Sequence, residues 1–265
     1  MELSLLRLAA LIALVPAALT LLRRPARRDT VFWSSLLVAL SGTLAWIVAK
    51  QSAGWSTGIS TALWLTIAAT LAFFVVVALV SEEAWRLTPL LLPYLLVLAV
   101  LASIWDQAPE RPLSPAAPLG WIGMHIVVSV ATYGLLTLAA VAALAAWLQS
   151  RALKAKTYSP LAKLLPSVAD SERLMLRLLA TSEVVLAAGL LTGVATLYAE
   201  SGRFFVLDHK TLLTSSVFVV VGLLLLANAR WGMRGRAAVR LVLLAYLLLT
   251  LGYPGVKFVT DILLA

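Results

Sequence analysis

Hydrophobic residues along this chain gather into eight long runs that are separated by short polar segments. Most runs hold about 20 residues, the length that an α-helix needs to cross the hydrocarbon core of a bilayer. They differ from the short alternating segments of a membrane β-barrel. We therefore expect an all-α, polytopic membrane helix bundle of about eight transmembrane helices. The runs are Glu2–Leu22, Val31–Lys50, Gly58–Val80, Thr88–Trp105, Leu119–Leu148, Arg177–Ala199, Thr211–Ala229 and Arg240–Ile262.

Composition supports a membrane protein and excludes two other classes. Hydrophobic residues make up 62% of the 265 residues, and charged residues make up 12%. Soluble domains are roughly 45–50% apolar and about one quarter charged, so a water-soluble globule or a disordered chain is excluded. We expect a single integral membrane domain over residues 1–265, with four spans in 1–105 and four more in 119–265.

Basic residues predict how the chain is oriented in the membrane. Cytoplasmic connections of membrane proteins carry an excess of Lys and Arg. Alternate connections here hold 15 of the 21 basic residues, and the opposite side holds 5, so we expect both termini on the outer, non-cytoplasmic side. This bias explains the net charge of +9 without nucleic acid as a partner, and membrane lipid is the expected surrounding. The richness in Ala, Leu and Arg is typical of GC-rich bacteria, which favours the bacterial plasma (inner) membrane.

Candidate chemistry is limited to few side chains. The chain has no cysteine, which excludes disulfides, thiolate metal sites and thiol catalysis. It has two histidines, His125 and His209, and both are expected at the outer side. His125 lies about five residues into the fifth run, roughly 8 Å below its outer end, and His209 lies in the outer connection before the seventh run.

A polar stripe follows one face of the fifth run, because His125, Ser129 and Tyr133 are spaced four residues apart. Two interpretations are open. The stripe is either an interhelical hydrogen-bond seam, or it holds an axial histidine of a haem whose second ring nitrogen is oriented by another group. Ser129 or an outer-loop residue is the candidate for that orienting group.

The outer connection before the seventh run combines aromatic and charged residues. Phe204 and Phe205 could lie against a porphyrin face, and Arg203 or Lys210 could pair with a propionate. The alternative is an ordinary interfacial loop, in which the phenylalanines dip into lipid and the charges stay in water.

From Trp121 onward, the sequence resembles the cytochrome c assembly family, haem-handling membrane proteins that include the CcsA and CcmC types. The resemblance implies that His125 is an axial haem ligand and that haem is the cofactor. It also implies apocytochrome c, or another assembly or membrane subunit, as a partner. The matching stretches are His125–Tyr133, Ser171–Leu174, Gly189 with Gly193, Asp208–Thr211 and Gly252–Phe258.

The sequence also departs from the family pattern. No tryptophan occurs between Trp147 and Trp231, so the family's WWD signature is missing, although Asp208 and Lys210 resemble its remnant. The family's second outer histidine follows its last span, whereas the residues here after that run contain none. These departures indicate the short branch that includes HemX-like proteins, and they suggest His209 as the replacement haem-iron ligand.

Three classes of function follow. The first is a haem-binding protein of cytochrome c assembly type that holds haem near the outer face through histidine, as a chaperone rather than a self-contained catalyst. The second is an accessory or regulatory membrane subunit without ligase activity, acting on haem synthesis or on another membrane protein. The third is a small-solute transporter, which is disfavoured because the spans lack a chain of mid-membrane charges and internal repeats.

Overall fold

The protein is built almost entirely of helices, as expected. The computed structural model describes residues 2–19, 28–52, 56–108, 111–112, 119–156, 159–204, 206 and 208–263. Its longer helices are α1 (Glu2–Leu19), α2 (Thr30–Gln51), α3 (Ile59–Val80), α4 (Thr88–Ile104), α5 (Leu119–Lys154), α7 (Val168–Ser201), α8 (His209–Trp231) and α9 (Arg236–Thr250).

Short elements connect or extend these helices. Two strands of two residues, β1 and β2, pair antiparallel, with Thr57 opposite Arg111. After α9 the chain continues through two π-helical turns, and the first of these contains Pro254. The short elements are β1 (Ser56–Thr57), η2 (Ala84–Leu87), η3 (Trp105–Gln107), β2 (Arg111–Pro112), α6 (Pro160–Leu164), η4 (Leu251–Gly255), α10 (Val256–Phe258) and η5 (Val259–Leu263).

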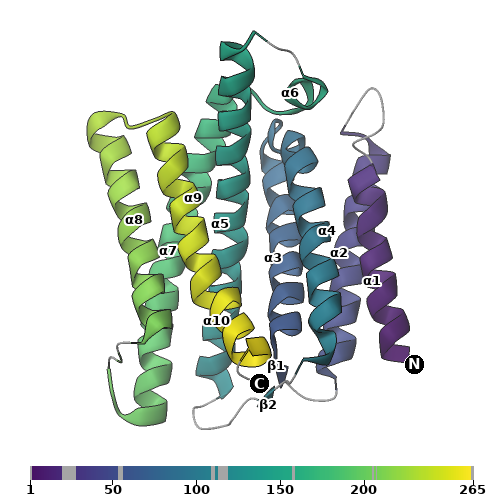
Figure 1. Cartoon of the computed structure of the whole chain (residues 1–265), viewed down its shortest axis with the longest axis vertical. Helices are drawn as coiled ribbons and strands as arrows, with labels where there is room; N and C mark the ends of the chain where they lie inside the picture. The colour runs from purple at the N-terminus through teal and green to yellow at the C-terminus, as the bar shows by residue number, and fades with distance from the viewer. Residues whose placement is uncertain are drawn as a thin grey trace.

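Within the described residues, seven helical segments are long and apolar enough to cross a membrane. They begin at α2 and end with the segment Arg236–Phe258, which joins α9 to α10. Helix α1 is an additional, shorter apolar helix that lies beside the others (Figure 1). The structure therefore confirms an all-α polytopic bundle, with seven spans of full length and α1 as the candidate for the eighth.

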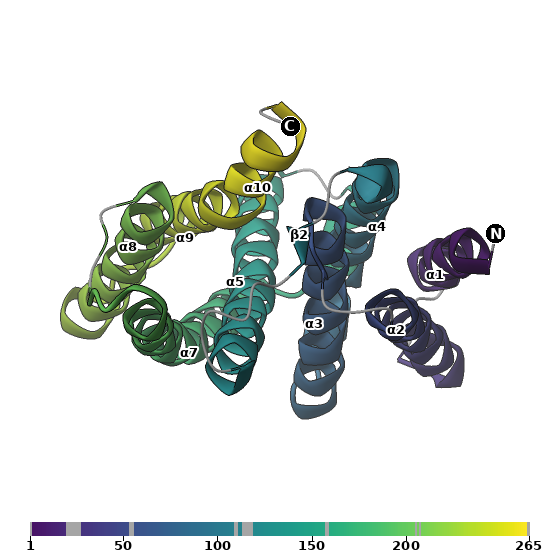
Figure 2. The same cartoon turned by 90° about the horizontal axis from the view of Figure 1, so that it is seen from below.

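The long helices form two closed groups (Figure 2). Helices α1 to α4 pack in a cycle in which α1 contacts both α2 and α4. Helices α5, α7, α8 and α9 form a second cycle, in which α5 contacts both α7 and α9. Helix α3 packs on α5 and joins the two groups. Gly134 permits this approach, because a Cβ atom there would lie 3.2 Å from the backbone nitrogen of Thr70.

The two ends of the bundle differ in which elements they hold. Both chain termini lie at the lower end in Figure 1, together with the start of α5 and the connection from α7 to α8. The elements η2 and α6 and the turn between α8 and α9 lie at the upper end. These upper elements carry basic residues, including Arg86, Lys163, Arg234 and Arg236. A chain that crosses the membrane an even number of times has both termini on the same side. The assignment of the upper end to the cytoplasm stays a prediction from charge.

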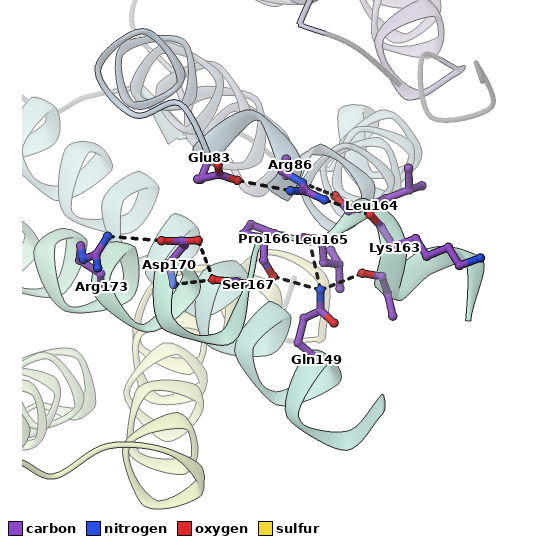
Figure 3. Close-up of polar contacts among 11 residues, drawn as sticks. Glu83, Arg86, Gln149, Lys163, Leu164, Leu165, Pro166, Ser167, Asp170 and Arg173 are labelled. Atoms are coloured by element: carbon purple, nitrogen blue, oxygen red, sulfur yellow. Dashed lines mark hydrogen bonds and ion pairs between the residues drawn. The ribbon is translucent and has the colours of Figure 1, made fainter. Parts of the chain in front are cut away.

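The connection between α5 and α7 is held in place by side chains from two other elements (Figure 3). The amide of Gln149 on α5 donates to the carbonyl oxygen of Ala162 at 2.7 Å and lies near two further carbonyls. The guanidinium of Arg86 on η2 donates to the carbonyls of Leu164 and Lys163 at 3.2 and 3.0 Å. These bonds satisfy carbonyl groups at the end of α6, which lack partners within that short helix.

An ion cluster ties α1, α2 and α3 to η3 at the lower end. The carboxylate of Asp106 accepts from Arg7 at 2.6 Å, from Lys50 at 2.7 Å and from the hydroxyl of Ser60 at 3.1 Å. The side chains of Arg7, Lys50 and Asp106 are 25%, 13% and 19% exposed. A carboxylate so largely removed from water requires such donors, because an unpaired buried charge is costly. Asp106 thereby fixes the end of the N-terminal helix group.

Candidate functional site

His125 lies in the first part of α5 and faces α7. Its Nδ1 atom is 3.2 Å from the Oγ1 atom of Thr192. The imidazole is half-buried, six residues after the start of α5, which is about 9 Å along the helix axis. The structure thus places His125 between two long helices near the lower end of the bundle, where the sequence predicts it.

The hydrogen bonds of Thr192 favour one tautomer of His125. Thr192 donates its hydroxyl proton to the carbonyl oxygen of Gly189, one turn earlier on α7, at 3.0 Å. A hydroxyl has a single proton, so it can only accept from His125. The Nδ1 atom therefore carries hydrogen, and the lone pair lies on Nε2. This is the arrangement of metal-binding histidines, in which one ring nitrogen is held and the other binds the metal.

Two glycines on α7 let it approach α5 at this point. A Cβ atom on Gly193 would lie 3.1 Å from Cε1 of His125, and one on Gly189 would lie 3.4 Å from Val128. The imidazole therefore packs directly against the backbone of α7. The sequence indicates this glycine pair as a helix-packing feature, but it does not reveal that Gly193 faces the histidine.

The polar stripe on α5 turns away from α7 as it runs from the start of the helix toward the middle of the bundle. Tyr133 is 2% exposed, and its hydroxyl lies 3.0 Å from Oγ1 of Thr250 on α9. Eight residues at about 100° each rotate the side chain by about 80° relative to His125. Ser129, midway, is half-buried and has no side-chain hydrogen bond within the described part of the chain. The side chain within hydrogen-bond distance of the imidazole is therefore that of Thr192, and the orienting role of Ser129 stays a prediction.

Four tyrosines meet where the two helix groups join, a feature that sequence reasoning missed. The hydroxyls of Tyr94 on α4 and Tyr246 on α9 share a hydrogen bond. The ring of Tyr133 lies 5.8 Å from that of Tyr246 and 6.4 Å from that of Tyr253, between centroids. Aromatic rings at such distances stabilise each other beyond the area they bury. The cluster supports the α5–α9 contact, about two turns further along α5 than His125 and closer to the middle of the bundle.

The connection from α7 to α8 places the other predicted residues. Helix α7 ends at Gly202, which has a positive φ of 67° that glycine adopts without strain. Asp208 caps α8, because its Oδ1 atom accepts from the backbone N–H of Thr211 at 2.7 Å. This hydrogen bond holds the pKa of Asp208 below its usual value. His209 is the first residue of α8, and not a loop residue as expected.

The remaining residues of this connection are exposed. Arg203, His209 and Lys210 all present their side chains to the surroundings. Phe204 is 66% exposed and stacks on Tyr198, with ring centroids 4.4 Å apart and an angle of 17° between the planes. Phe205 lies outside the described residues. An exposed aromatic pair beside cations fits both interpretations of this segment, a porphyrin contact and an interfacial loop.

The two histidines share one end of the bundle but do not meet. Among the described residues, none of the hydrogen bonds or ion pairs joins His125 to His209. Thr192, which marks the level of His125, lies nine residues before the end of α7, about 13 Å along the axis. Glu200, on the same face of α7, is near enough to act electrostatically on His125. In this structure His209 therefore does not lie where it could bind the same metal as His125.

One acidic residue lies within the membrane-spanning part of α7. The Oε1 atom of Glu183 would lie 3.0 Å from a Cβ atom on Gly222 of α8. Its Oε2 atom is buried and has no hydrogen-bond partner among the described residues. The carboxyl group thus faces the neighbouring helix α8.

Comparison with known proteins gives the family. The family model described as Cytochrome C assembly protein matches residues 29–264, so the similarity extends into the N-terminal helices beyond the half expected. An uncharacterized 28.8 kDa protein in the nifR3-like 5′ region of Azospirillum brasilense is 54% identical over 262 residues, 97% of each chain. Protein HemX of Brevibacillus brevis is 25% identical over 159 residues, 60% of this chain and 58% of that protein.

No solved structure matches the chain. The family match covers most of the sequence, and the helices it covers include both histidines and the residues around them. This multi-pass membrane protein belongs to the cytochrome c assembly protein family.

Proposed function

We propose that this protein binds haem near the outer face of the membrane through His125, and that it acts as a haem chaperone in cytochrome c assembly. The observation that carries the proposal is the held imidazole: Thr192 fixes Nδ1, and Nε2 keeps the lone pair that binds iron. The family match supports a role in cytochrome c assembly.

The residues at the site fit haem better than a bare metal ion. Among the described residues, no group of three or more His, Asp or Glu side chains could hold a metal ion. A bare ion needs about that many protein ligands, whereas the porphyrin supplies the equatorial ligands of haem and leaves the axial positions to the protein. Bound haem supplies the redox chemistry, and the chain supplies the ligand, its orientation and exclusion of water.

The exposed residues of the α7–α8 connection have proposed roles at the same end. Arg203 and Lys210 are cations that would pair with the propionates, and Phe204 is an exposed aromatic ring. Asp208 caps the start of α8, and thereby fixes the backbone of the next two residues, His209 and Lys210. Ser129 and Tyr133 stay predicted contacts of the pocket.

His209 is proposed as the second axial ligand, and this requires movement. Both imidazoles would have to reach the same iron, to which each would supply one nitrogen. His125 lies about 9 Å from the start of α5 and about 13 Å from the end of α7, measured along the helix axes. His209 begins α8 at this same end of the bundle. The start of α8 would therefore approach His125 when both ligate one iron.

The test is the absorbance spectrum of the protein purified in detergent after expression with sufficient haem. We expect a Soret band for the unaltered protein, its loss in His125→Ala, and a shift in position or height for His209→Ala. Thr196→Val serves as a control near the histidine, since the Thr196 hydroxyl bonds to the carbonyl of Thr192 and does not contact the imidazole. Absence of the band from the unaltered protein would overturn haem binding.

A second function, an accessory or regulatory membrane subunit, is favoured by one observation. The tryptophans of the assembly signature are absent between Trp147 and Trp231. Deletion of the gene distinguishes the two functions. Loss of mature cytochrome c supports assembly, with apocytochrome c as partner, whereas normal cytochromes with altered haem precursors support regulation.

The outer placement of the site rests on charge. The lower end of the bundle, where both termini and His125 lie, is proposed to face the non-cytoplasmic side of the bacterial plasma membrane. Reporter fusions at the C-terminus test this, because alkaline phosphatase is active only outside the cytoplasm and a fluorescent protein such as GFP only inside.

A further inference from the structure

A cavity of about 560 Å³ opens between α5 and α9 at the end of the bundle opposite to His125. Three arginines line it, Arg151 from the last turn of α5 and Arg236 and Arg240 from the start of α9. The rest of its lining includes Leu144, Trp147, Ser150 and Leu243. The size lies within the range of small-molecule sites, about 300–1,000 Å³.

The lining changes from basic to apolar along both helices in the same direction. On α5, Leu144 lies seven residues before Arg151, and on α9, Leu243 lies seven residues after Arg236. Because the helices run antiparallel, each leucine lies about 10 Å deeper in the bundle than its arginine. The cavity therefore has a cationic mouth near the bundle end and an apolar floor toward its middle.

The cationic mouth has no acidic counterpart in the described residues. None of the three arginines forms an ion pair there. Glu172 of α7 lies beside the connection between α8 and α9. Its carboxylate accepts the backbone N–H of Gly235 at 3.0 Å and forms no ion pair with the three arginines. The guanidinium of Arg151 lies 5.4 Å from the ring centroid of Trp147, a cation–π contact that orients it without neutralising its charge.

We propose that this cavity binds an anionic phospholipid, with its phosphate at Arg151, Arg236 and Arg240 and its acyl chains along Leu144 and Leu243. Three guanidinium groups provide paired N–H donors for phosphate oxygens. The polarity gradient matches the order of head group and chain in a lipid, and basic pockets between helices at the cytoplasmic side are suited to anionic head groups. A free phosphate would leave the apolar floor exposed to water.

Native mass spectrometry of the purified full chain tests the site, with phosphatidylglycerol, phosphatidylcholine and inorganic phosphate as separate probes. We expect a 1:1 adduct with phosphatidylglycerol that phosphatidylcholine does not form and that equimolar phosphate does not displace. The double variant R236Q/R240Q should bind phosphatidylglycerol with an affinity lower by about tenfold or more. The matched control R230Q/R234Q removes the same charge from the end of α8 and the α8–α9 connection, outside the cavity, and should bind as the unaltered protein does.

Each other outcome overturns the proposal. Equal adducts with phosphatidylcholine would remove the role of charge, and equal binding of inorganic phosphate would identify a phosphate site and not a lipid site. Equal losses in the double variant and the control would show general attraction to a basic surface. If the double variant elutes as aggregate, the single variant R240Q replaces it, because Arg240 is exposed and its loss leaves the helix core intact.

Discussion

The Nδ1 atom of His125 lies 3.2 Å from the hydroxyl oxygen of Thr192, and that oxygen lies 3.0 Å from the carbonyl oxygen of Gly189. The chain of two hydrogen bonds runs from the imidazole to the backbone of α7. With the threonine proton donated to the carbonyl, Nδ1 is the donor of the pair and Nε2 keeps the lone pair. The proposed ligand is therefore oriented before any cofactor arrives.

Removing the hydroxyl of Thr192 should weaken haem binding without disturbing the helix. Thr192→Val keeps the branched shape but leaves Nδ1 without its acceptor, and loss of such a partner typically costs about 10–100-fold in metal affinity. Thr192→Ser should retain affinity. Haem titration followed at the Soret band measures the change.

Thr196→Val is the matched control, because Thr196 bonds to the carbonyl of Thr192 one turn away and does not contact the histidine. An equal loss of affinity in both variants would indicate a general effect on α7, and would contradict the orienting role.

A side chain at position 193 should displace the imidazole. The Cβ atom of Gly193→Ala would lie 3.1 Å from Cε1 of His125, so the ring or the helix must shift, and overpacking of this kind costs about 1–3 kcal/mol. We expect a lower unfolding temperature in detergent and weaker haem binding. Gly123→Ala on α5 is the control, since nothing lies within 4 Å of its Cβ position. Equal stability of the two variants would show that α7 does not press on the histidine.

The sequence predicts the ligand but not its surroundings. His125 is identifiable because a histidine in an apolar span is uncommon and needs a partner. Its partner Thr192 lies 67 residues away, and no local pattern distinguishes it from Thr196. The stripe on α5 suggests Ser129 instead, but a helix of 3.6 residues per turn rotates the stripe away from α7 within two turns. Pairing between helices is a tertiary property, so the sequence of one helix cannot supply it.

The fold is predicted well where apolar length decides it and less well at helix ends. The spans are found because about 20 apolar residues are needed to cross a bilayer. Helix α5 extends to Lys154, since polar residues outside the membrane continue a helix without any apolar signal. Helix α7 begins after Ser167, whose hydroxyl accepts from the N–H of Asp170, and so starts nine residues before the apolar run at Arg177. Several good N-caps in succession cannot be ranked from sequence alone.

Neutralising Asp106 should destabilise the N-terminal helix group. Asp106→Asn leaves Arg7 and Lys50 largely buried without their carboxylate, and breaking such pairs costs several kcal/mol when burial is complete. With partial exposure we expect about 2 kcal/mol, measured by thermal unfolding in detergent. Asp170→Asn provides the comparison, because its partner Arg173 is 62% exposed and such pairs contribute about 0–1 kcal/mol. A loss no larger than that of the comparison would exclude a structural role for the cluster.

The tyrosine pair between α4 and α9 should couple the two helix groups. Tyr246→Phe removes one hydroxyl and leaves that of Tyr94 half-buried with fewer partners, at a cost of about 1–3 kcal/mol. The double variant Tyr94→Phe/Tyr246→Phe should be less destabilised than the sum of the single variants, because the second loss removes a hydroxyl that is already without its partner. A double-mutant cycle of unfolding free energies measures the coupling, and strict additivity would show that the two hydroxyls do not interact.

The start of α8 should loosen at acid pH. The Asp208 carboxylate accepts the N–H of Thr211, and its pKa lies below the usual aspartate value of about 4. A lowered pKa means that the folded state favours the charged form. The stabilisation is therefore complete above the usual value and is lost as the pH falls through the lowered pKa. Hydrogen exchange of the first turn of α8, compared between pH 6 and pH 3, should show faster opening in acid. Asp208→Asn keeps a capping oxygen that does not titrate, so comparison at each pH removes the intrinsic pH dependence of exchange. If the asparagine variant loses protection in acid as the unaltered protein does, the effect does not arise at Asp208.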